Sequence, residues 1–195
     1  IKKIGAWAFS YCTNLESITI PKTVKIIGSK AFSNCKKLKK ITIPKNVEKI
    51  GAWAFSYCTN LESITIHKSV KEIGIGAFCG CEKLKKITIP KNVKKISGLT
   101  FEDCTSLESI TIPESVKEIG YHAFWGCESL KKITIPKNVK KIGRWAFAYC
   151  VNLESINLPK TIKKIGAGTF QNCESLKKIV IPKNVEEIGK AAFKE

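Results

Sequence analysis

The chain has 195 residues, no Met, and a net charge of +18 from 34 basic and 16 acidic residues. No apolar stretch approaches the length that crosses a bilayer, which excludes a transmembrane helix from these residues. The sequence pI of about 9.6 points instead to a partner that carries negative charge, such as nucleic acid, acidic polysaccharide or an anionic cell surface.

A repeat of 23 residues, without insertions, runs through the whole chain. It is clearest for phenylalanine, at Phe9, Phe32, Phe55, Phe78, Phe101, Phe124, Phe147, Phe170 and Phe193. A fixed period of this length is typical of a solenoid, in which each repeat forms one coil and contacts only its neighbours. The chain is long enough for about 8.5 such coils.

Two extended segments are predicted in each coil. In Ile64-Thr65-Ile66 apolar and polar residues alternate, which predicts a short strand with both isoleucines inward and Thr65 outward. Proline follows this strand in seven of eight coils and must end it, because proline lacks the N–H that a ladder needs. Val70 and Ile73 then mark a second extended segment, which a glycine closes.

The remaining part of each coil is predicted to be helical. Ala54, Phe55, Cys58 and Leu61 follow one another at steps of one, three and three. This spacing suits one to two turns of helix with the apolar side inward. The predicted fold class is therefore an α/β solenoid in which each coil has short parallel strands and a short helical segment.

The consensus LxxIxIPxxVxxIGxxAFxxC closely resembles the BspA-like, or Treponema pallidum-type, leucine-rich repeat. The resemblance covers essentially the whole chain, since the IP, IG, AF and C elements recur at fixed offsets. It implies a parallel-stranded solenoid in a secreted or cell-surface protein of bacteria or parasitic protozoa that adheres to host or microbial partners. It implies no catalytic residues, because the family carries no catalytic motif.

Residues 1–195 are expected to form one leucine-rich-repeat domain. Ile1 and Glu195 both interrupt a coil and no polar cap is recognisable, whereas solenoids need capping repeats for solubility. We therefore expect either a fragment of a longer protein or ends that associate head to tail with other copies.

One column of lysines is the best candidate for contact with anions. It follows the proline and consists of Lys22, Lys45, Lys68, Lys91, Lys137, Lys160 and Lys183, with Glu114 as its one acid. Stacked like charges gain nothing from folding. The alternative is that these lysines only keep a long repeat soluble. Nucleic acid is disfavoured, because Arg144 is the single arginine and no nucleic-acid motif is present.

A second charged column alternates in sign. It reads Glu16, Lys39, Glu62, Lys85, Glu108, Lys131, Glu154 and Lys177. Opposite charges on adjacent rungs of a sheet stabilise the pairing of strands, so we expect this column to fix the register. The alternation also shows a longer period of 46 residues, because the stretch from Ile4 to Ile20 is identical to that from Ile50 to Ile66.

Eight of the nine cysteines occupy a periodic apolar position, and we expect a buried ladder of free thiols. Disulfides and a metal site are the alternatives, and both suit a straight column poorly because its side chains run parallel. Cys79 lies outside this column, where other coils have Ser10 or Ser33, and is expected to be exposed. An exposed thiol there could form a bridge between chains.

Aromatic residues outside the core recur with the longer period. The candidate aromatic stripe comprises Trp7, Tyr11, Trp53, Tyr57, Trp145 and Tyr149. Such rings could stack on sugars or on another protein. The other reading is that the indoles pack over small residues of the neighbouring coil, such as Gly76 and Gly168.

These observations predict a non-catalytic extracellular or cell-surface binding and adhesion module. No nucleophile elbow, phosphate loop or HExxH motif is present, so no catalytic, cofactor or metal site is predicted. The expected partner is a protein or glycan of a host or microbial surface, held through many weak repeated contacts. The competing prediction is a structural protein that assembles end to end into filaments.

Overall fold

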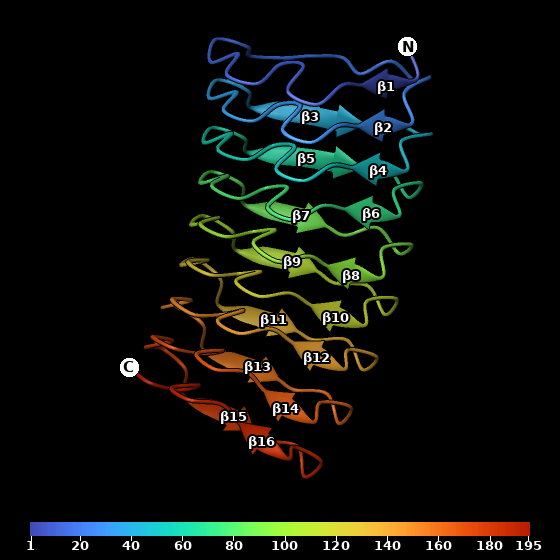
Figure 1. The fold of residues 1–195 in the computed structure, drawn as a ribbon. Helices are drawn as coiled ribbons and strands as arrows, with labels where there is room; N and C mark the ends of the chain where they lie inside the picture. The colour runs from blue at the N-terminus through green and yellow to red at the C-terminus, as the bar shows by residue number, and fades with distance from the viewer.

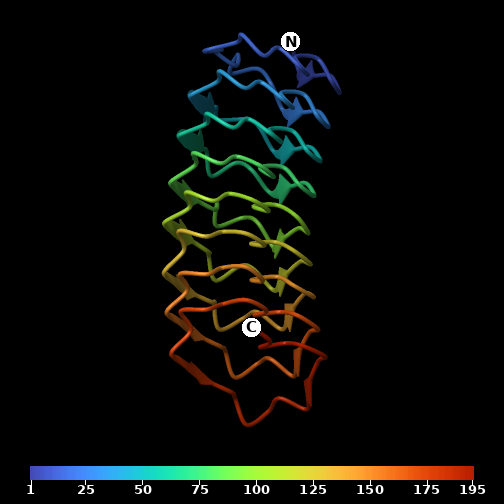
Figure 2. The ribbon, with the colours of Figure 1, turned by 90° about the vertical axis from the view of Figure 1, so that its left-hand side faces the viewer.

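A computed structural model describes residues 1–195 as a solenoid, in which parallel-stranded coils are stacked from one end of the chain to the other (Figure 1). From Lys40 onward each coil contributes strands to two columns, which lie on different sides of the coil (Figure 2). The column of longer strands contains β3 (Lys40–Ile43), β5 (Ser63–Ile66), β7 (Lys86–Thr88), β9 (Ser109–Thr111), β11 (Lys132–Thr134), β13 (Ser155–Asn157) and β15 (Lys178–Val180). We call this side the long-strand face.

The second column consists of two-residue strands and forms the short-strand face. Its members are β1 (Lys3–Ile4), β2 (Ile26–Ile27), β4 (Lys49–Ile50), β6 (Glu72–Ile73), β8 (Lys95–Ile96), β10 (Glu118–Ile119), β12 (Lys141–Ile142), β14 (Lys164–Ile165) and β16 (Glu187–Ile188). Paired strands lie in the register of the repeat, as Ile41 with Ile64 and Ile50 with Ile73, and each column is divided into two sheets, with breaks between β6 and β8 and between β9 and β11. Both predicted extended segments are confirmed.

The core is one apolar cluster of 51 buried residues. In a central coil all eight predicted inward positions are buried, and the phenylalanines form a continuous stack. Neighbouring rings are nearly parallel, with centroids 5.1 Å apart between Phe124 and Phe147 and 5.7 Å apart between Phe78 and Phe101. Each ring thus buries its faces against the coils before and after it, which explains why a coil needs neighbours to fold.

The predicted helical segment is wrong, because the structure has no helix. The stretch consists of turns in which an N–H bonds to the carbonyl three residues earlier, such as Cys58 to Phe55 at 3.3 Å. Alternate N–H groups point along the axis instead, so that Phe55 N donates to Ala77 O of the next coil at 2.8 Å. This pattern requires a left-handed residue at two positions of every coil, for example Trp53 at φ 57° and Tyr57 at φ 56°.

The turns also overturn the predicted exposure of Cys79, which is only 1% exposed. The equivalent residues of the two preceding coils, Ser33 and Ser56, are also buried, and their hydroxyl oxygens lie 2.8 Å apart. This position therefore faces the neighbouring coils rather than solvent. A helix would have pointed this position outward, whereas the left-handed residues on either side of it turn it toward the stack. A bridge between chains through Cys79 is therefore not supported.

All nine cysteines are free, and the expected thiol ladder is buried from Cys35 to Cys173. Each buried thiol donates to the phenylalanine carbonyl of the preceding coil, as Cys104 Sγ does to Phe78 O at 3.2 Å. Burial is the first cause of a raised thiol pKa along the ladder, and it brings the pKa of Cys35 to about 11 and that of Cys173 to about 12. Cys12, in the first coil, is exposed.

This difference predicts that a thiol reagent labels the native protein at one site. Cys12 is expected to react at once, because it is exposed and its thiolate is accessible. The other eight thiols should react only after denaturant is added, and mass spectrometry of the labelled peptides would assign them. In a Cys12→Ser variant the fast phase should vanish; fast labelling of several cysteines would show that the ladder is not buried.

Candidate functional site: a basic face

The lysine column lies in the turn between the long and the short strand of each coil. All seven of its lysines are exposed, and none belongs to an ion pair of the structure. The main chain beneath them is fixed by side-chain amides of the following coil: Asn46 Nδ2 donates to Lys22 O, and Asn92 Nδ2 to Lys68 O, both at 2.8 Å. The column therefore presents free ammonium groups on a rigid edge.

Two further charged columns follow within four residues and cover the short-strand face. The first, which we call the flanking column, contains Lys2, Lys25, Glu48, Lys71, Lys94, Lys117, Lys140, Lys163 and Glu186. The second, the strand column, contains Lys3, Ile26, Lys49, Glu72, Lys95, Glu118, Lys141, Lys164 and Glu187. Together with the lysine column they hold 19 lysines against six glutamates, which is +13 of the net charge of +18. We call these three columns the basic face.

The long-strand face is much less charged. Its alternating column cancels to zero, because four lysines oppose four glutamates, and the adjacent column adds +4 through Lys40, Lys86, Lys132 and Lys178. Adjacent members do stack, as Glu62 N bonds to Lys39 O at 2.9 Å, but no ion pair joins their side chains. The ion pairs expected there lie on the basic face instead, for example between Lys49 and Glu72 at 2.6 Å and between Lys71 and Glu48 at 2.8 Å.

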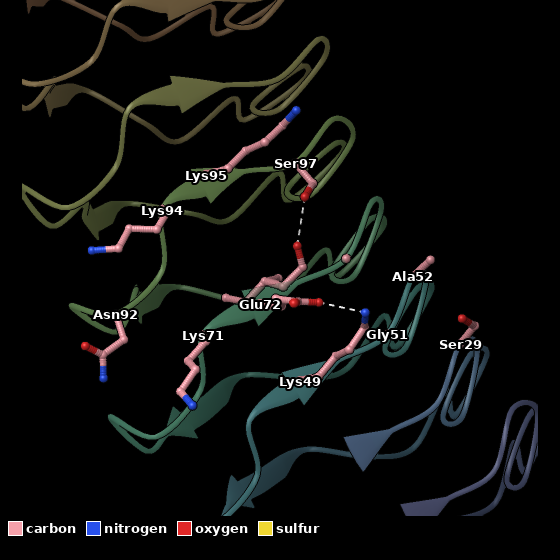
Figure 3. Close-up of a pocket in the computed structure, with 12 residues that line it drawn as sticks. Ser29, Lys49, Gly51, Ala52, Lys71, Glu72, Asn92, Lys94, Lys95 and Ser97 are labelled. Atoms are coloured by element: carbon pink, nitrogen blue, oxygen red, sulfur yellow. Dashed lines mark hydrogen bonds and ion pairs between the residues drawn. The ribbon is translucent and has the colours of Figure 1, made fainter. Parts of the chain in front are cut away.

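A shallow groove of about 840 Å³ runs over β4, β6 and β8 on the basic face (Figure 3). Lys49 reaches across one rung to Glu72, Lys94 extends toward the edge near Asn92, and Lys71 points toward the preceding coil, where it pairs with Glu48. A second hollow of about 440 Å³ shares Lys95 and Ser97 with the first. It continues the groove past Tyr121 to Lys141 and Arg144, so lysines line a path along the solenoid axis.

The aromatic stripe lies in the turn segment that follows the short strand. Trp7, Tyr11, Tyr57, Trp145 and Tyr149 are exposed, and Trp53 is half-buried. Three of the rings also pack on the next coil: a Cβ at Gly76 would lie 2.5 Å from the Trp53 indole, one at Gly80 would lie 2.6 Å from the Tyr57 ring, and one at Gly168 would overlap the Trp145 indole. In the first coil the Lys30 ammonium group lies 4.2 Å from the centroid of the Trp7 ring. The packing role is thus visible, and binding by the stripe stays a prediction.

The close fit of Trp53 on Gly76 predicts that Gly76→Ala is strongly destabilising. Gly76 has φ +60°, and a methyl group there would displace the indole. We expect the free energy of unfolding to fall by about 2–4 kcal/mol, because the substitution combines left-handed backbone strain with overpacking. Urea unfolding would measure it. Gly5→Ala is the control, because nothing lies within 4 Å of its added methyl group; equal losses in the two variants would contradict the packing role.

The sequence reading missed a second aromatic group, which the structure forms from Tyr121, His122 and Trp125. The His122 ring stacks on Trp125 at 6.2 Å and meets the edge of Trp145 at 5.6 Å. Its Nδ1 lies 3.1 Å from Glu102 Oε1, and Cys79 Sγ donates to the other oxygen of Glu102 at 3.5 Å. Except for Trp145, which recurs with Trp7 and Trp53, these residues each occur once at positions that vary between coils, and that was the available signal.

This cluster does not form a reactive site. Burial and the nearby Glu102 carboxylate raise the pKa of Cys79 to about 12, so its thiol is protonated at neutral pH and a poor nucleophile. No group of three or more histidine, cysteine or acidic side chains in the structure is placed to hold a metal ion. The structure also contains no helix long and apolar enough to span a membrane.

Comparison with known proteins gives one family and several solved structures. A family model described as BspA type leucine rich repeat region (6 copies) matches residues 1–108 and 94–195. No curated protein matches the chain. A leucine rich cell surface protein from Faecalibacterium prausnitzii is similar over 99% of this chain and 62% of its own, with 32% identity and a TM-score of 0.74.

Two further crystal structures show the same similarity. A leucine-rich repeat protein from Bacteroides ovatus is 30% identical over 100% of this chain and 68% of its own, with a TM-score of 0.61. The leucine rich repeat protein of T. pallidum is 28% identical over 97% of this chain and 74% of its own, with a TM-score of 0.63. The chain thus spans about two thirds of the length of these solved relatives.

Proposed function

Because the chain belongs to the BspA-type leucine-rich repeat family, we propose that it is a non-catalytic binding module of the cell surface or extracellular space, and that its basic face holds an anionic partner. The observation that carries this proposal is the segregation of charge, with +13 of +18 on three adjacent columns. The cell-surface description of the F. prausnitzii relative supports the location. The partner would be a protein or glycan of a host or microbial surface.

The proposed binding is repetitive rather than local. Each coil offers a similar set of exposed lysines, so an extended partner can contact several coils at once. Individual contacts between exposed charges are weak and screened by salt, but linked contacts add up through a high effective concentration. Binding should therefore weaken steeply as the salt concentration rises.

Charge reversal in two matched sets of lysines tests the proposal. The test variant changes Lys45, Lys91, Lys137 and Lys183 to Glu, all in the lysine column and 46 residues apart. The control changes Lys39, Lys85, Lys131 and Lys177 to Glu, which alters the net charge equally on the long-strand face. Surface plasmon resonance on immobilised heparin and on anionic cells would measure binding.

We expect the first variant to lose about tenfold or more in apparent affinity, and the second much less. Because the net charge falls by the same amount in both variants, their comparison removes any effect of net charge. Equal losses would show that the basic face is not the binding surface. Circular dichroism would establish that both variants keep their strand content.

End-to-end assembly is the second candidate function, and the near-identity of the coils favours it. Ile4–Ile20 and Ile50–Ile66 are the same sequence, so coils of two chains could stack much as coils of one chain do. Electron microscopy over a range of concentrations would show rods of uniform width if this candidate is right, and short separate particles if it is not.

A further inference from the structure

Lysines of the flanking column form ion pairs at some positions along the axis and none at others. Near one end Lys71 pairs with Glu48 at 2.8 Å, and near the other Lys163 pairs with Glu186 at 3.2 Å. Between these pairs the column places Lys94, Lys117 and Lys140 on adjacent rungs, since Lys117 N bonds to Lys94 O and Lys140 N to Lys117 O, both at 2.9 Å. None of these three lysines has an ion-pair partner.

The lysine column adds Lys91 and Lys137 beside this run, also unpaired. We call Lys91, Lys94, Lys117, Lys137 and Lys140 the central lysine cluster. The acid between its two edge lysines is Glu114, and Asn138 Nδ2 lies 3.5 Å from its carboxylate and 2.9 Å from its carbonyl. Like charges on adjacent rungs repel and destabilise a sheet. The fold therefore carries a local electrostatic cost that a bound anion would remove.

In the strand column beside the cluster, by contrast, the lysines form ion pairs. Glu118 bridges Lys95 and Lys141, each at 3.3 Å, and this pairing lowers the pKa of the glutamate against the opposing effect of its partial burial. Charges of the strand column are thus compensated here, whereas those of the central lysine cluster beside it are not. Such an arrangement leaves the cluster free to contact a ligand that lies parallel to the axis.

We propose that the ligand of the central lysine cluster is a linear anionic polysaccharide that runs along the solenoid axis over β8, β10 and β12. This inference rests on the proposed function and specifies its partner. The rungs repeat at about 4.8 Å, so a polymer with regularly spaced carboxylates or sulfates can meet one ammonium group after another. Because the rungs are nearly alike, the ligand needs a uniform repeat rather than a particular sequence.

The chemistry of the lining favours a polysaccharide over nucleic acid. The cluster consists only of lysines, which act as single point charges, whereas phosphate and base edges are best bound by the fork of arginine. Tyr121 lines the groove and is 47% exposed, so its ring is available to pack against a sugar. Ser97 and Asn92, which also line the groove, supply polar groups for hydroxyls.

Heparin oligosaccharides of increasing, defined length test this proposal by isothermal titration calorimetry. Affinity should rise with length, because each added sugar unit reaches another rung, and should level off once the cluster is spanned. Neutralising Lys94, Lys117 and Lys140 with Gln should lower the affinity for the long oligosaccharides by about tenfold or more. The control neutralises Lys39, Lys85 and Lys131 with Gln, and it should change the affinity little.

The outcomes separate this inference from the proposed function. Binding that does not depend on length would overturn the axial polymer while leaving an anion-binding module. Tighter binding of single-stranded DNA than of a heparin chain of similar charge would overturn the polysaccharide assignment. Equal losses in the two triple variants would overturn the role of the cluster, and no binding to any polyanion would overturn the proposed function as well.

Discussion

Raising the pH from about 8.5 to about 10 is expected to unfold the protein, because the seven buried thiols of the ladder and that of Cys79 must stay protonated in the native state. Eight cysteines have a pKa raised chiefly by burial, including Cys79 at about 12. In the unfolded chain they titrate near the ordinary value of about 8.5. Above that pH the unfolded state binds fewer protons than the native state, so the free energy of unfolding falls as the pH rises.

The expected slope is large, since each thiol can contribute about 1.4 kcal/mol per pH unit and eight together about 11 kcal/mol per pH unit. Below about pH 7 both states are protonated at these sites and the buried thiols give no slope. Urea unfolding in the presence of a reductant, repeated at several pH values, would measure the free energy. A variant with Cys58, Cys104 and Cys150 changed to Ala should lose about three eighths of the slope.

Cys12→Ala is the matched control for that experiment, because Cys12 is exposed. Its slope should equal that of the unmodified protein. The slope is the right readout, since alanine in the ladder also removes packing and lowers stability at every pH. A triple variant with an unchanged slope would show that the buried thiols do not govern the alkaline transition.

The second large effect is expected for Phe101→Ala, in the middle of the ring stack. Phe101 is fully buried between Phe78, with centroids 5.7 Å apart, and Phe124, at 5.4 Å. Truncation leaves a cavity and removes both stacking contacts. We therefore expect the free energy of unfolding to fall by about 3–5 kcal/mol. Because each coil is stabilised only by its neighbours, the cavity also weakens the coupling between the two halves of the stack.

Phe193→Ala is the control for the stack. Phe193 is 37% exposed and stacks on one ring only, Phe170, at 5.4 Å. Its truncation should cost about 1 kcal/mol. Urea unfolding would compare the two variants, and a change in m-value for Phe101→Ala would reveal the loss of coupling. Similar costs at both sites would contradict a stack that depends on neighbours on both sides.

Most of the coil could be predicted from the sequence, because each prediction followed from one physical requirement repeated many times. The alternation in Ile64-Thr65-Ile66 predicts the long strand, which the structure contains as β5. Pro90 follows β7 closely, as expected of a residue that cannot extend the ladder. The register follows from the fixed period, so each residue lies beside its equivalent in the next coil.

The turn segment was predicted wrongly because its apolar spacing fits two structures. Steps of one, three and three suit a helix, but they also suit successive turns that each advance three residues. Backbone conformation decides between them, and the informative signal was at Gly76 and Gly80. Glycines, asparagines and aspartates recur at these two positions, which marks a left-handed backbone. The tryptophans and tyrosines at the same positions in other coils obscured it.

The lysine column was predicted as an isolated feature, and its neighbourhood was not. The sequence shows that Lys91 has an acid, Glu114, as a neighbour in its own column, yet it does not show which neighbours of opposite charge form ion pairs. The structure supplies this information: Glu118 pairs with Lys95 and Lys141, and Glu48 pairs with Lys71, whereas Glu114 pairs with no lysine. These ion pairs distinguish lysines that have an acidic partner from lysines that have none. The distinction narrows the proposed anion-binding surface from the whole basic face to the central lysine cluster.

Lysine footprinting with and without a bound heparin chain tests the central claim most directly, because it reads every lysine at once. The protein would be acetylated briefly in each state and the modified peptides quantified by mass spectrometry. Protection is predicted at Lys91, Lys94, Lys117, Lys137 and Lys140, with Lys39, Lys85 and Lys131 unchanged. Equal protection on both faces, or protection of the long-strand face alone, would contradict a binding site on the basic face.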